Sequence, residues 1–289
     1  VRSNMTENHN IIPARHIHEE CGVFGIFTPQ EADVASYAYY ALYSLQHRGQ
    51  ESAGIVVNDD GLFRSLRDTG LVSEVFPPEQ LKSLGKGTIA VGHVRYGTTG
   101  SDNKRNVQPI LVNHFKGRMA LAHNGNLTNS RELRQELESR GSIFQTTTDS
   151  EVIAYIIVQE RLNRGSIEEA VSAAMDRIEG AYSLVLSSPT KLIAARDPHG
   201  FRPLCMGHLK DGSVVFASES CALDAIGADV LGINCSQGPA ELRGLAARML
   251  TVTDKPVMVQ ANAGLPHVDD DGNTCLLYTS DAADEARSV

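Results

Sequence analysis

The chain has 289 residues, of which 42% are hydrophobic and 21% charged, a composition that excludes disordered, collagen-like and small disulfide-rich proteins. Its 35 acidic and 26 basic residues give a formal net charge of −9, which opposes binding to nucleic acid or to an anionic membrane surface. The length predicts one large domain or two smaller ones.

The cysteines and the apolar stretches indicate the cellular compartment in which the protein is expected. Five cysteines are scattered without the spacing of a metal site or a disulfide framework, which predicts a reducing, cytoplasmic setting. The apolar stretches are shorter than the roughly 20 residues that a membrane span needs, so no membrane segment is expected. The first twenty residues lack the apolar run of a secretory signal.

Strands are predicted where short apolar runs occur, at 22–27, 54–57, 88–94, 119–122, 182–186, 191–195 and 214–217. Helices are predicted over 33–46, 129–140, 149–163 and 166–179, each followed by a glycine, at Gly49, Gly141, Gly165 and Gly180. Ser166 and Glu169 form a capping box at the start of the last helix. The elements do not alternate as in a parallel α/β sheet, so the order favours an α+β domain over roughly 21–230.

Cys21 stands between a polar leader and an apolar strand in the segment EECGVFGIF. Gly22 and Gly25 would let a ligand approach the backbone there. A lone cysteine is more often a small buried hydrophobic residue, and this segment alone leaves that alternative open.

Three polar segments follow predicted strands or begin a helix. In HVRYGTTG, Arg95 could bind a carboxylate through its guanidinium or be an exposed arginine on a turn. In LAHNGNL, Asn124 and Gly125 could stabilise an oxyanion, although Asn-Gly is also the commonest signal of a hairpin turn. In TTTDSEV, Asp149 could cap a helix, bind a substrate ammonium, or do both.

Five segments in order carry a family resemblance: ECGVFGIF, YSLQHRGQESAG, GHVRYGTTG, AHNGNL and TDSEV. Together they resemble the class II glutaminase domain of the amidophosphoribosyltransferases. The resemblance implies an N-terminal-nucleophile hydrolase fold, a four-layer αββα sandwich of two antiparallel sheets covered by helices. Glucosamine-phosphate synthases are the alternative within this class, but their motifs differ from this chain at His47 and Tyr96.

The resemblance also implies that residues 1–20 are a leader, or propeptide, that is removed. In this fold the nucleophilic cysteine is residue one of the mature chain, because its own α-amino group acts as the general base. An α-amine has a pKa of about 8, near neutrality, whereas an amide to Glu20 cannot accept the proton.

Each site residue receives its role from the resemblance. Cys21 is the expected nucleophile, Asn124 and Gly125 are the expected oxyanion donors, and glutamine is the expected ligand of Arg95, Thr98 and Asp149. The products would be glutamate and ammonia. In an intact enzyme the ammonia would convert phosphoribosyl pyrophosphate to phosphoribosylamine in purine biosynthesis.

The resemblance also bears on cofactors and assembly. No cofactor or metal is expected in this chain. Magnesium for phosphoribosyl pyrophosphate, and an iron–sulfur cluster, are expected only in intact relatives. Members of the family form homo-oligomers.

The resemblance ends near Asp229, and the phosphoribosyltransferase domain expected after it is missing. Residues 229–274 resemble a fragment of the homocysteine-binding barrel of cobalamin-dependent methyltransferases. Only Cys235 of that family's three zinc thiolates is present, so no zinc site is expected. We predict that residues 231–274 are a foreign barrel fragment without its own core and that 275–289 are a disordered, adapter-like tail. A chimeric reading frame or a natural truncation would explain the junction.

Two other functions stay open at this point. The domain could bind glutamine without catalysis if Cys21 never gains a free amino group. His9, His16 and His18 could bind a metal together with Cys21, although their spacing fits no standard zinc pattern.

Overall fold

The computed structural model describes residues 21–96, 104–228, 231–235, 247, 257–261, 266–268 and 274–276. The expected leader with its three histidines, Thr98 and the tail after residue 276 lie outside these ranges. Within 21–228 the strands form one six-stranded and one four-stranded sheet.

Both sheets are antiparallel throughout. The six-stranded sheet has the order β3-β2-β4-β1-β10-β9. Its strands are β1 (Gly22–Ala32), β2 (Ser52–Asp59), β3 (Leu62–Thr69), β4 (Gly87–Arg95), β9 (Cys205–His208) and β10 (Val214–Ala217). The four-stranded sheet has the order β5-β6-β7-β8. Its strands are β5 (Ile110–His114), β6 (Gly117–Leu127), β7 (Gly180–Ser187) and β8 (Leu192–Arg196).

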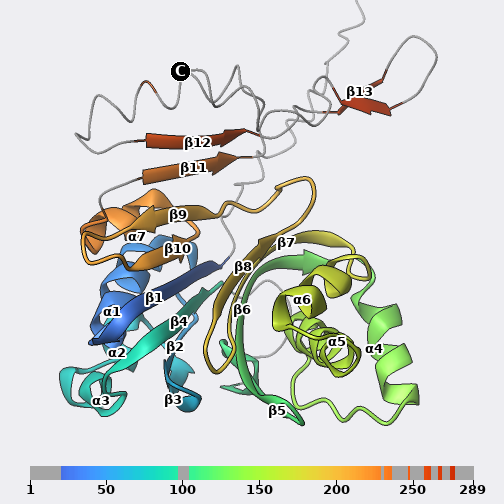
Figure 1. Ribbon diagram of the computed structural model, residues 1–289, viewed down its shortest axis with the longest axis horizontal. Coiled ribbons are helices and arrows are strands. Elements are labelled where there is room, and N and C mark those ends of the chain that lie inside the picture. Colours follow the sequence, from blue (N-terminus) through green and yellow to red (C-terminus); the bar gives the residue numbers. More distant parts are fainter. Residues whose placement is uncertain are drawn as a thin grey trace, which may run out of the picture.

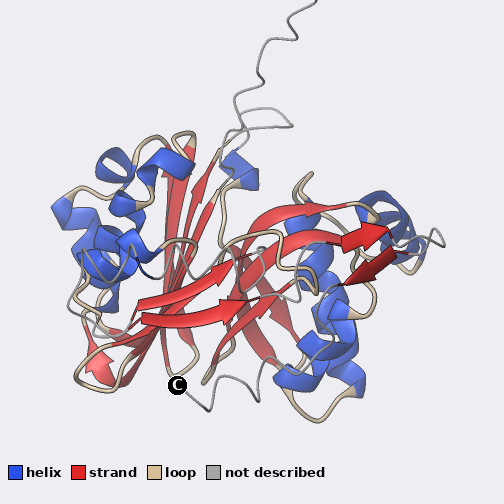
Figure 2. Cartoon of the chain, turned by 90° about the horizontal axis from the view of Figure 1, so that it is seen from above, coloured by secondary structure: helices blue, strands red, loops and turns tan. Residues whose placement is uncertain are grey.

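Helices cover the outer face of each sheet, so the domain has four layers (Figure 1). The six-stranded sheet carries α1 (Val34–Ser44), α2 (Val72–Val75), α3 (Pro78–Ser83) and α7 (Ser220–Ala225). The four-stranded sheet carries α4 (Ser130–Ser139), α5 (Asp149–Asn163) and α6 (Ile167–Met175). Figure 2 shows the strands in the middle with helices on both sides. The predicted αββα sandwich is therefore confirmed.

Apolar side chains fill each space between the layers. One cluster joins α1 to the six-stranded sheet, and a second joins α5 and α6 to the four-stranded sheet. A third lies between the two sheets and includes Val23, Val91, Ala122 and Val185. Because both faces of a middle layer are covered, β2 and β4 are buried along nearly their whole length.

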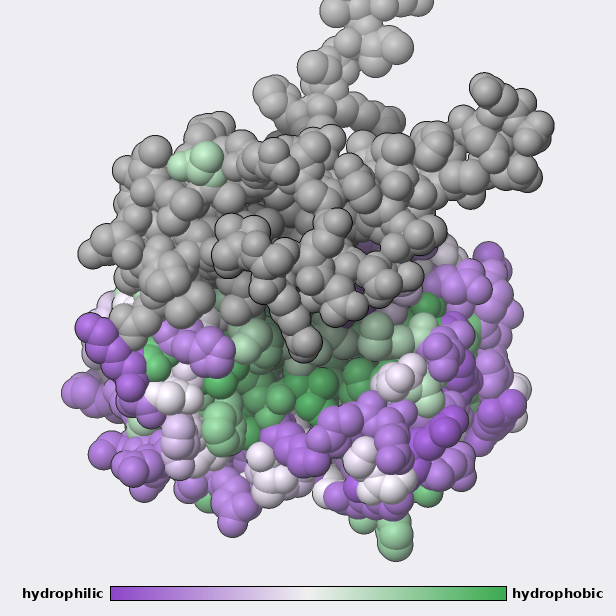
Figure 3. Space-filling model, turned by 45° about the horizontal axis from the view of Figure 1, so that its top comes forward, coloured by the Kyte–Doolittle hydropathy of each residue, from purple (hydrophilic) through white to green (hydrophobic). Residues whose placement is uncertain are grey.

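The space between the sheets reaches the surface at one edge. A cleft of about 490 Å³ lies there, and its apolar lining comes from β1, β8 and β10: Phe27, Leu192, Ile193, Val214 and Phe216. Figure 3 shows apolar residues gathered in the middle of one face, with polar residues below them and to either side. β8 is an edge strand of its sheet and is half-buried along its length, so this side of the sandwich is only partly covered.

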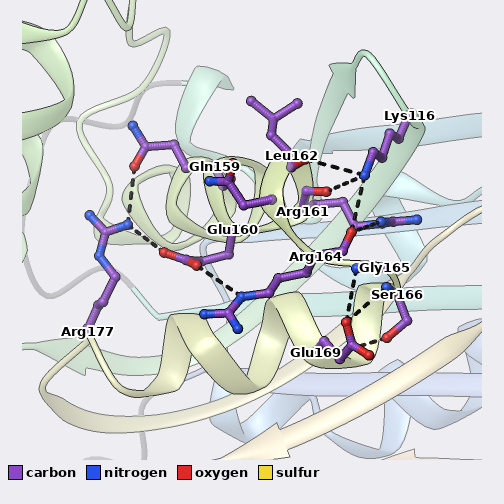
Figure 4. A network of polar contacts seen from close by, with 11 residues as sticks. Lys116, Gln159, Glu160, Arg161, Leu162, Arg164, Gly165, Ser166, Glu169 and Arg177 are labelled. Atoms are coloured by element: carbon purple, nitrogen blue, oxygen red, sulfur yellow. Dashed lines mark hydrogen bonds and ion pairs between the residues drawn. The ribbon is translucent and has the colours of Figure 1, made fainter.

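The end of α5 agrees with the predicted bounds. α5 covers Asp149–Asn163 as predicted, and its C-cap residue Arg164 is extended, so Gly165 does not form a left-handed cap. The ammonium of Lys116, from the turn between β5 and β6, donates to the carbonyls of Arg161 and Arg164 at 2.9 and 3.2 Å (Figure 4). A cation on the last carbonyls of a helix satisfies them and complements the helix dipole.

The next helix begins as predicted and ends earlier. Ser166 and Glu169 form the capping box at the start of α6, which Figure 4 also shows. α6 ends at Met175 rather than at Glu179, and Gly180 is the first residue of β7. Of the four predicted stops, Gly141 takes a positive φ of 91° directly after the end of α4.

After residue 230 the structure describes the backbone of two strand pairs. β11 (Leu231–Cys235) and β12 (Val257–Ala261) pair in parallel, and β13 (Pro266–Val268) and β14 (Thr274–Leu276) pair antiparallel. β11 lies next to β9 and α7 (Figure 1). Among the helices within the described ranges, none is long and apolar enough to cross a membrane.

Candidate active site

Four of the predicted site residues line one cleft of about 320 Å³: Cys21, Arg95, Gly125 and Asp149. They lie directly before β1, at the end of β4, near the end of β6 and at the start of α5. Asn124 is buried beside Gly125 but does not line the cleft, and Thr98 lies outside the described residues. The cleft has the size of a site for a small molecule.

Cys21 is held at its carbonyl by a buried arginine. The guanidinium of Arg48 donates from Nε to the Cys21 carbonyl oxygen at 2.7 Å and from Nη1 to the carboxylate of Glu219. Burial alone would raise the pKa of Glu219, but the hydrogen bond and charge of Arg48 outweigh it and hold the pKa below its usual value. Cys21 itself has a φ of 57°, which is rare for a residue other than glycine. The Arg48–Glu219 pair thus fixes the start of β1 in this conformation.

The other two cysteines within residues 21–228 have surroundings unlike a nucleophile's. Burial and the nearby carboxylate of Glu219 raise the pKa of Cys221 to about 11, so its thiol stays protonated near neutrality. Cys205 is a core residue of β9. Cys21 is the cysteine that lines the cleft.

Arg95 is a buried residue, and the alternative of an exposed arginine on a turn is wrong. It is the last residue of β4, and its side chain is 9% exposed. Its Nη1 donates to Glu51 Oε1 at 3.1 Å, and the backbone N–H of Glu51 donates to the Arg95 carbonyl at 3.0 Å. These two contacts orient the guanidinium at the wall of the cleft.

Asn124 and Gly125 lie inside a strand, so the alternative of a hairpin turn is also wrong. They pair with Ser183 and Tyr182 of β7 in the continuous β6–β7 ladder. Gly125 has a φ of 142°, and a Cβ atom on it would lie 2.0 Å from the carbonyl oxygen of Ala181. Only glycine fits this position.

The side chain of Asn124 is buried without a hydrogen-bond partner among the described residues. Its exposed fraction is 0%, and neither Oδ1 nor Nδ2 has a partner there. An unsatisfied buried polar group costs about 1–3 kcal/mol. A fold that retains such an amide beside a cleft keeps a donor available for a ligand.

Asp149 is the first residue of α5, one position after the N-cap residue Thr148, so the predicted N-cap was displaced by one residue. Its Oδ2 accepts from the backbone N–H of Leu127 at 2.9 Å, and its Oδ1 lies 3.6 Å from Nδ1 of His123. Burial would raise the pKa of Asp149, but His123 and the N–H groups of Leu127 and Ser150 outweigh it and keep the pKa below its usual value. Asp149 therefore carries a negative charge at neutral pH.

Several residues that shape the cleft have no role predicted from the sequence. Arg48 and Glu51 stand in the segment HRGQESAG, whose charges next to an apolar strand were the available signal. His123 directly precedes Asn124 and lines the cleft. Gln108 also lines it, and no local pattern in the sequence marks this residue.

Two family models match the chain. A model described as a glutamine amidotransferase domain matches residues 93–225, and one described as homocysteine S-methyltransferase matches residues 201–287. Residues 201–225 fall in both matches. In the structure β9, β10 and α7 of this shared range belong to the six-stranded sheet and its helical layer.

Several curated relatives are amidophosphoribosyltransferases. Amidophosphoribosyltransferase 2 of Arabidopsis thaliana is 49% identical over 72% of this chain and 36% of its own length. The amidophosphoribosyltransferases of Methanocaldococcus jannaschii and Bacillus subtilis are 46% and 45% identical over 72% and 74% of this chain, and in both cases 44% of the relative is covered. The chain thus spans less than half the length of these relatives.

Solved structures agree in fold. A glutamine phosphoribosyl pyrophosphate amidotransferase from B. subtilis, complexed with ADP and GMP, is 45% identical with a TM-score of 0.65 over 72% of this chain and 44% of that one. A structure described as the allosteric regulatory enzyme of purine biosynthesis is 44% identical with a TM-score of 0.67 over the same shares. The fold, the cleft and these matches together show that residues 21–228 form a glutamine amidotransferase domain similar to that of the amidophosphoribosyltransferases.

Proposed function

We propose that residues 21–228 hydrolyse glutamine to glutamate and ammonia, and that Cys21 is the nucleophile. The observation that carries the proposal is the single cleft in which β1, β4, β6 and α5 bring together a thiol, a guanidinium, a carboxylate and a glycine with its N–H. In an intact enzyme the ammonia would convert phosphoribosyl pyrophosphate to phosphoribosylamine. The cysteine usage supports a cytoplasmic location.

Charge complementarity would orient glutamine in the cleft. The guanidinium of Arg95, held by Glu51, would bind the α-carboxylate, and the hydroxyl of Thr98 would add a donor to it. The ionised Asp149 would bind the α-ammonium. The side-chain amide of glutamine would then point toward Cys21 and Gly125.

The reaction would pass through a thioester. After removal of residues 1–20, the α-amino group of Cys21 takes the thiol proton while sulfur bonds to the amide carbon. The Nδ2 of Asn124 and the N–H of Gly125 stabilise the resulting oxyanion. The leaving nitrogen takes the proton back from the α-ammonium of Cys21 and departs as ammonia, and water then cleaves the thioester to release glutamate and the free thiol.

We further propose that the chain joins this domain to a foreign barrel fragment over residues 231–274, followed by an adapter-like tail over 275–289. The match to homocysteine S-methyltransferase supports the first assignment. The parallel pairing of β11 with β12 also supports it, because β/α barrels are built from parallel strands.

The test measures glutamate and ammonia from glutamine, with the N-terminal residue determined by mass spectrometry. A chain expressed with Met directly before Cys21, which is trimmed, should be active. Cys21→Ser should abolish hydrolysis, whereas the matched control Cys221→Ser should retain it. Equal loss in both variants, or full activity in a chain that still carries Glu20, would refute the proposal.

A further inference from the structure

Contacts with β3 and β2 hold the backbone of the segment from Asn106 to Pro109 in place. The guanidinium of Arg67, on β3, donates from Nη1 to the carbonyls of Val107 and Pro109 at 3.1 and 2.8 Å. The carbonyl oxygen of Gln108 packs so closely on β2 that a Cβ atom on Gly54 would lie 2.0 Å from it. The backbone of this segment is thus held against the six-stranded sheet, whereas the side chains of Asn106 and Gln108 contact other parts of the domain.

The side chain of Gln108 extends the hydrogen bonding of the strand that carries Gly125. The β5–β6 pairing runs as far as Ile110 with Leu121, so β5 does not reach His123. Gln108 contacts the backbone there: Oε1 accepts from the N–H of His123 at 2.8 Å, and Nε2 donates to its carbonyl at 3.4 Å. His123 is the residue directly before Asn124, so one buried amide fixes the approach to both expected oxyanion donors.

The side chain of Asn106 makes the equivalent contact with the other wall of the cleft. Its Nδ2 donates to Thr147 Oγ1 at 3.0 Å, and its Oδ1 accepts from the N–H of Thr147 at 3.2 Å. The carboxylate of Glu151 fixes the same loop by accepting from the N–H of Thr146 at 2.7 Å. This loop leads directly into Asp149, at the start of α5.

We propose that Asn106 and Gln108 are positioning residues with separate tasks in the proposed glutaminase. Gln108 aligns the strand that stabilises the oxyanion, and Asn106 aligns the loop that binds the α-ammonium of glutamine. The inference rests on the proposed function, which supplies the two tasks. Arg67 helps to place both side chains, because it holds the backbone carbonyls of Val107 and Pro109 on either side of Gln108.

The two tasks have different kinetic signatures. Oxyanion stabilisation acts in the transition state, so its loss lowers kcat, whereas loss of a contact used equally in the ground state raises KM. We expect Gln108→Ala to lower kcat by about 10–100-fold and to change KM by less than about threefold. We expect Asn106→Ala to raise KM by about tenfold and to change kcat by less than about threefold.

Asn58→Ala is the matched control. Asn58 is a fully buried amide on β2 whose Nδ2 donates to Ser187 Oγ and to the carbonyls of Ser188 and Pro189. It lies outside the cleft, so the variant loses buried amide hydrogen bonds without touching the proposed site. It should lower the melting temperature while leaving kcat and KM unchanged.

Amide hydrogen exchange tests the positioning without any activity. Exchange at His123, followed by NMR in the full chain, should speed up by at least about tenfold in Gln108→Ala and stay unchanged in Asn106→Ala and Asn58→Ala. An unchanged His123 amide in Gln108→Ala would overturn the inference, and so would identical kinetic profiles for the Gln108 and Asn106 variants. A wild-type chain that failed to hydrolyse glutamine would refute the proposed function instead, and the exchange rates would still decide the positioning.

Discussion

The close approach of β6 and β7 at Gly125 makes Gly125→Ala a sharp test of the fold around the site. A Cβ atom there would lie 2.0 Å from the carbonyl oxygen of Ala181 and 2.9 Å from the Cα of Tyr182. Both atoms belong to the backbone of β7, which cannot turn aside as a side chain can. The strand pairing must therefore open where the oxyanion donors are expected.

Two costs add in this variant. A positive φ costs a residue with a side chain about 1–3 kcal/mol, and forcing an extra methyl group into packed structure costs about 1–3 kcal/mol more. The sum is about 2–6 kcal/mol, a large part of the roughly 5–15 kcal/mol that typically separates folded and unfolded domains. Gly141→Ala supplies the control, because Gly141 has a φ of 91° and a Cβ atom added to it would meet nothing within 4 Å.

The assay is urea unfolding followed by circular dichroism on the wild-type chain and both variants. Gly141→Ala should show the conformational cost alone, and Gly125→Ala should lose about 1–3 kcal/mol more and hydrolyse no glutamine. If Gly125→Ala were no less stable than Gly141→Ala, the close contact between β6 and β7 would not exist and the argument would fail.

Three further predictions concern titratable groups. Burial lowers the pKa of His93 to about 3, so below pH ~6.5 the unfolded chain binds a proton that the folded chain does not. The free energy of unfolding should therefore decrease as the pH is lowered from ~6.5 toward ~3, by up to about 1.4 kcal/mol per pH unit. His93→Gln should reduce this pH dependence in urea unfolding experiments. The lowered pKa of Asp149 means that its stabilisation is fully present above pH ~4 and is lost as pH falls through the folded value; an Asp149→Asn variant that retained the full acid loss would contradict this. At pH ~8 a thiol with a pKa of about 11 is ionised in about one molecule in a thousand, so iodoacetamide should modify Cys21 well before Cys221, as peptide mapping by mass spectrometry would show.

Turn signals show how far local sequence determines this fold. Asp60-Gly61 forms the tight turn between β2 and β3, with φ values of 44° and 89°. The same kind of signal at Asn124-Gly125 is no turn, because β7 pairs straight through it. β7 comes from a segment more than fifty residues later in the chain, and a local pattern contains no information about that pairing.

The strand β3 was not predicted from the sequence, and the reason is similar. β3 has the sequence LFRSLRDT and is only partly buried, so its mixed polarity hid it, yet it pairs with β2 along its whole length. The residues that line the cleft were predictable where they lie in a motif, as Cys21 and Asp149 do. The contact between the Gln108 side chain and the backbone of His123 was not predictable, because the two residues lie in different segments and no local pattern links them.

The overlap of the two family matches raises a question that stability can settle, namely which fold residues 201–225 belong to. In the structure β10 pairs with β1, and its Val215 and the α7 residue Leu223 are fully buried in the core of the six-stranded sheet. These two side chains alone contribute about 3–6 kcal/mol of burial free energy, a large share of a typical domain stability. A fragment of residues 21–228 should therefore unfold cooperatively within a few degrees of the corresponding transition in the full chain, whereas a fragment of residues 21–200 should show no cooperative transition by circular dichroism. Equal cooperativity in the two fragments would mean that β9, β10 and α7 are dispensable to the amidotransferase fold and belong with the segment that follows them.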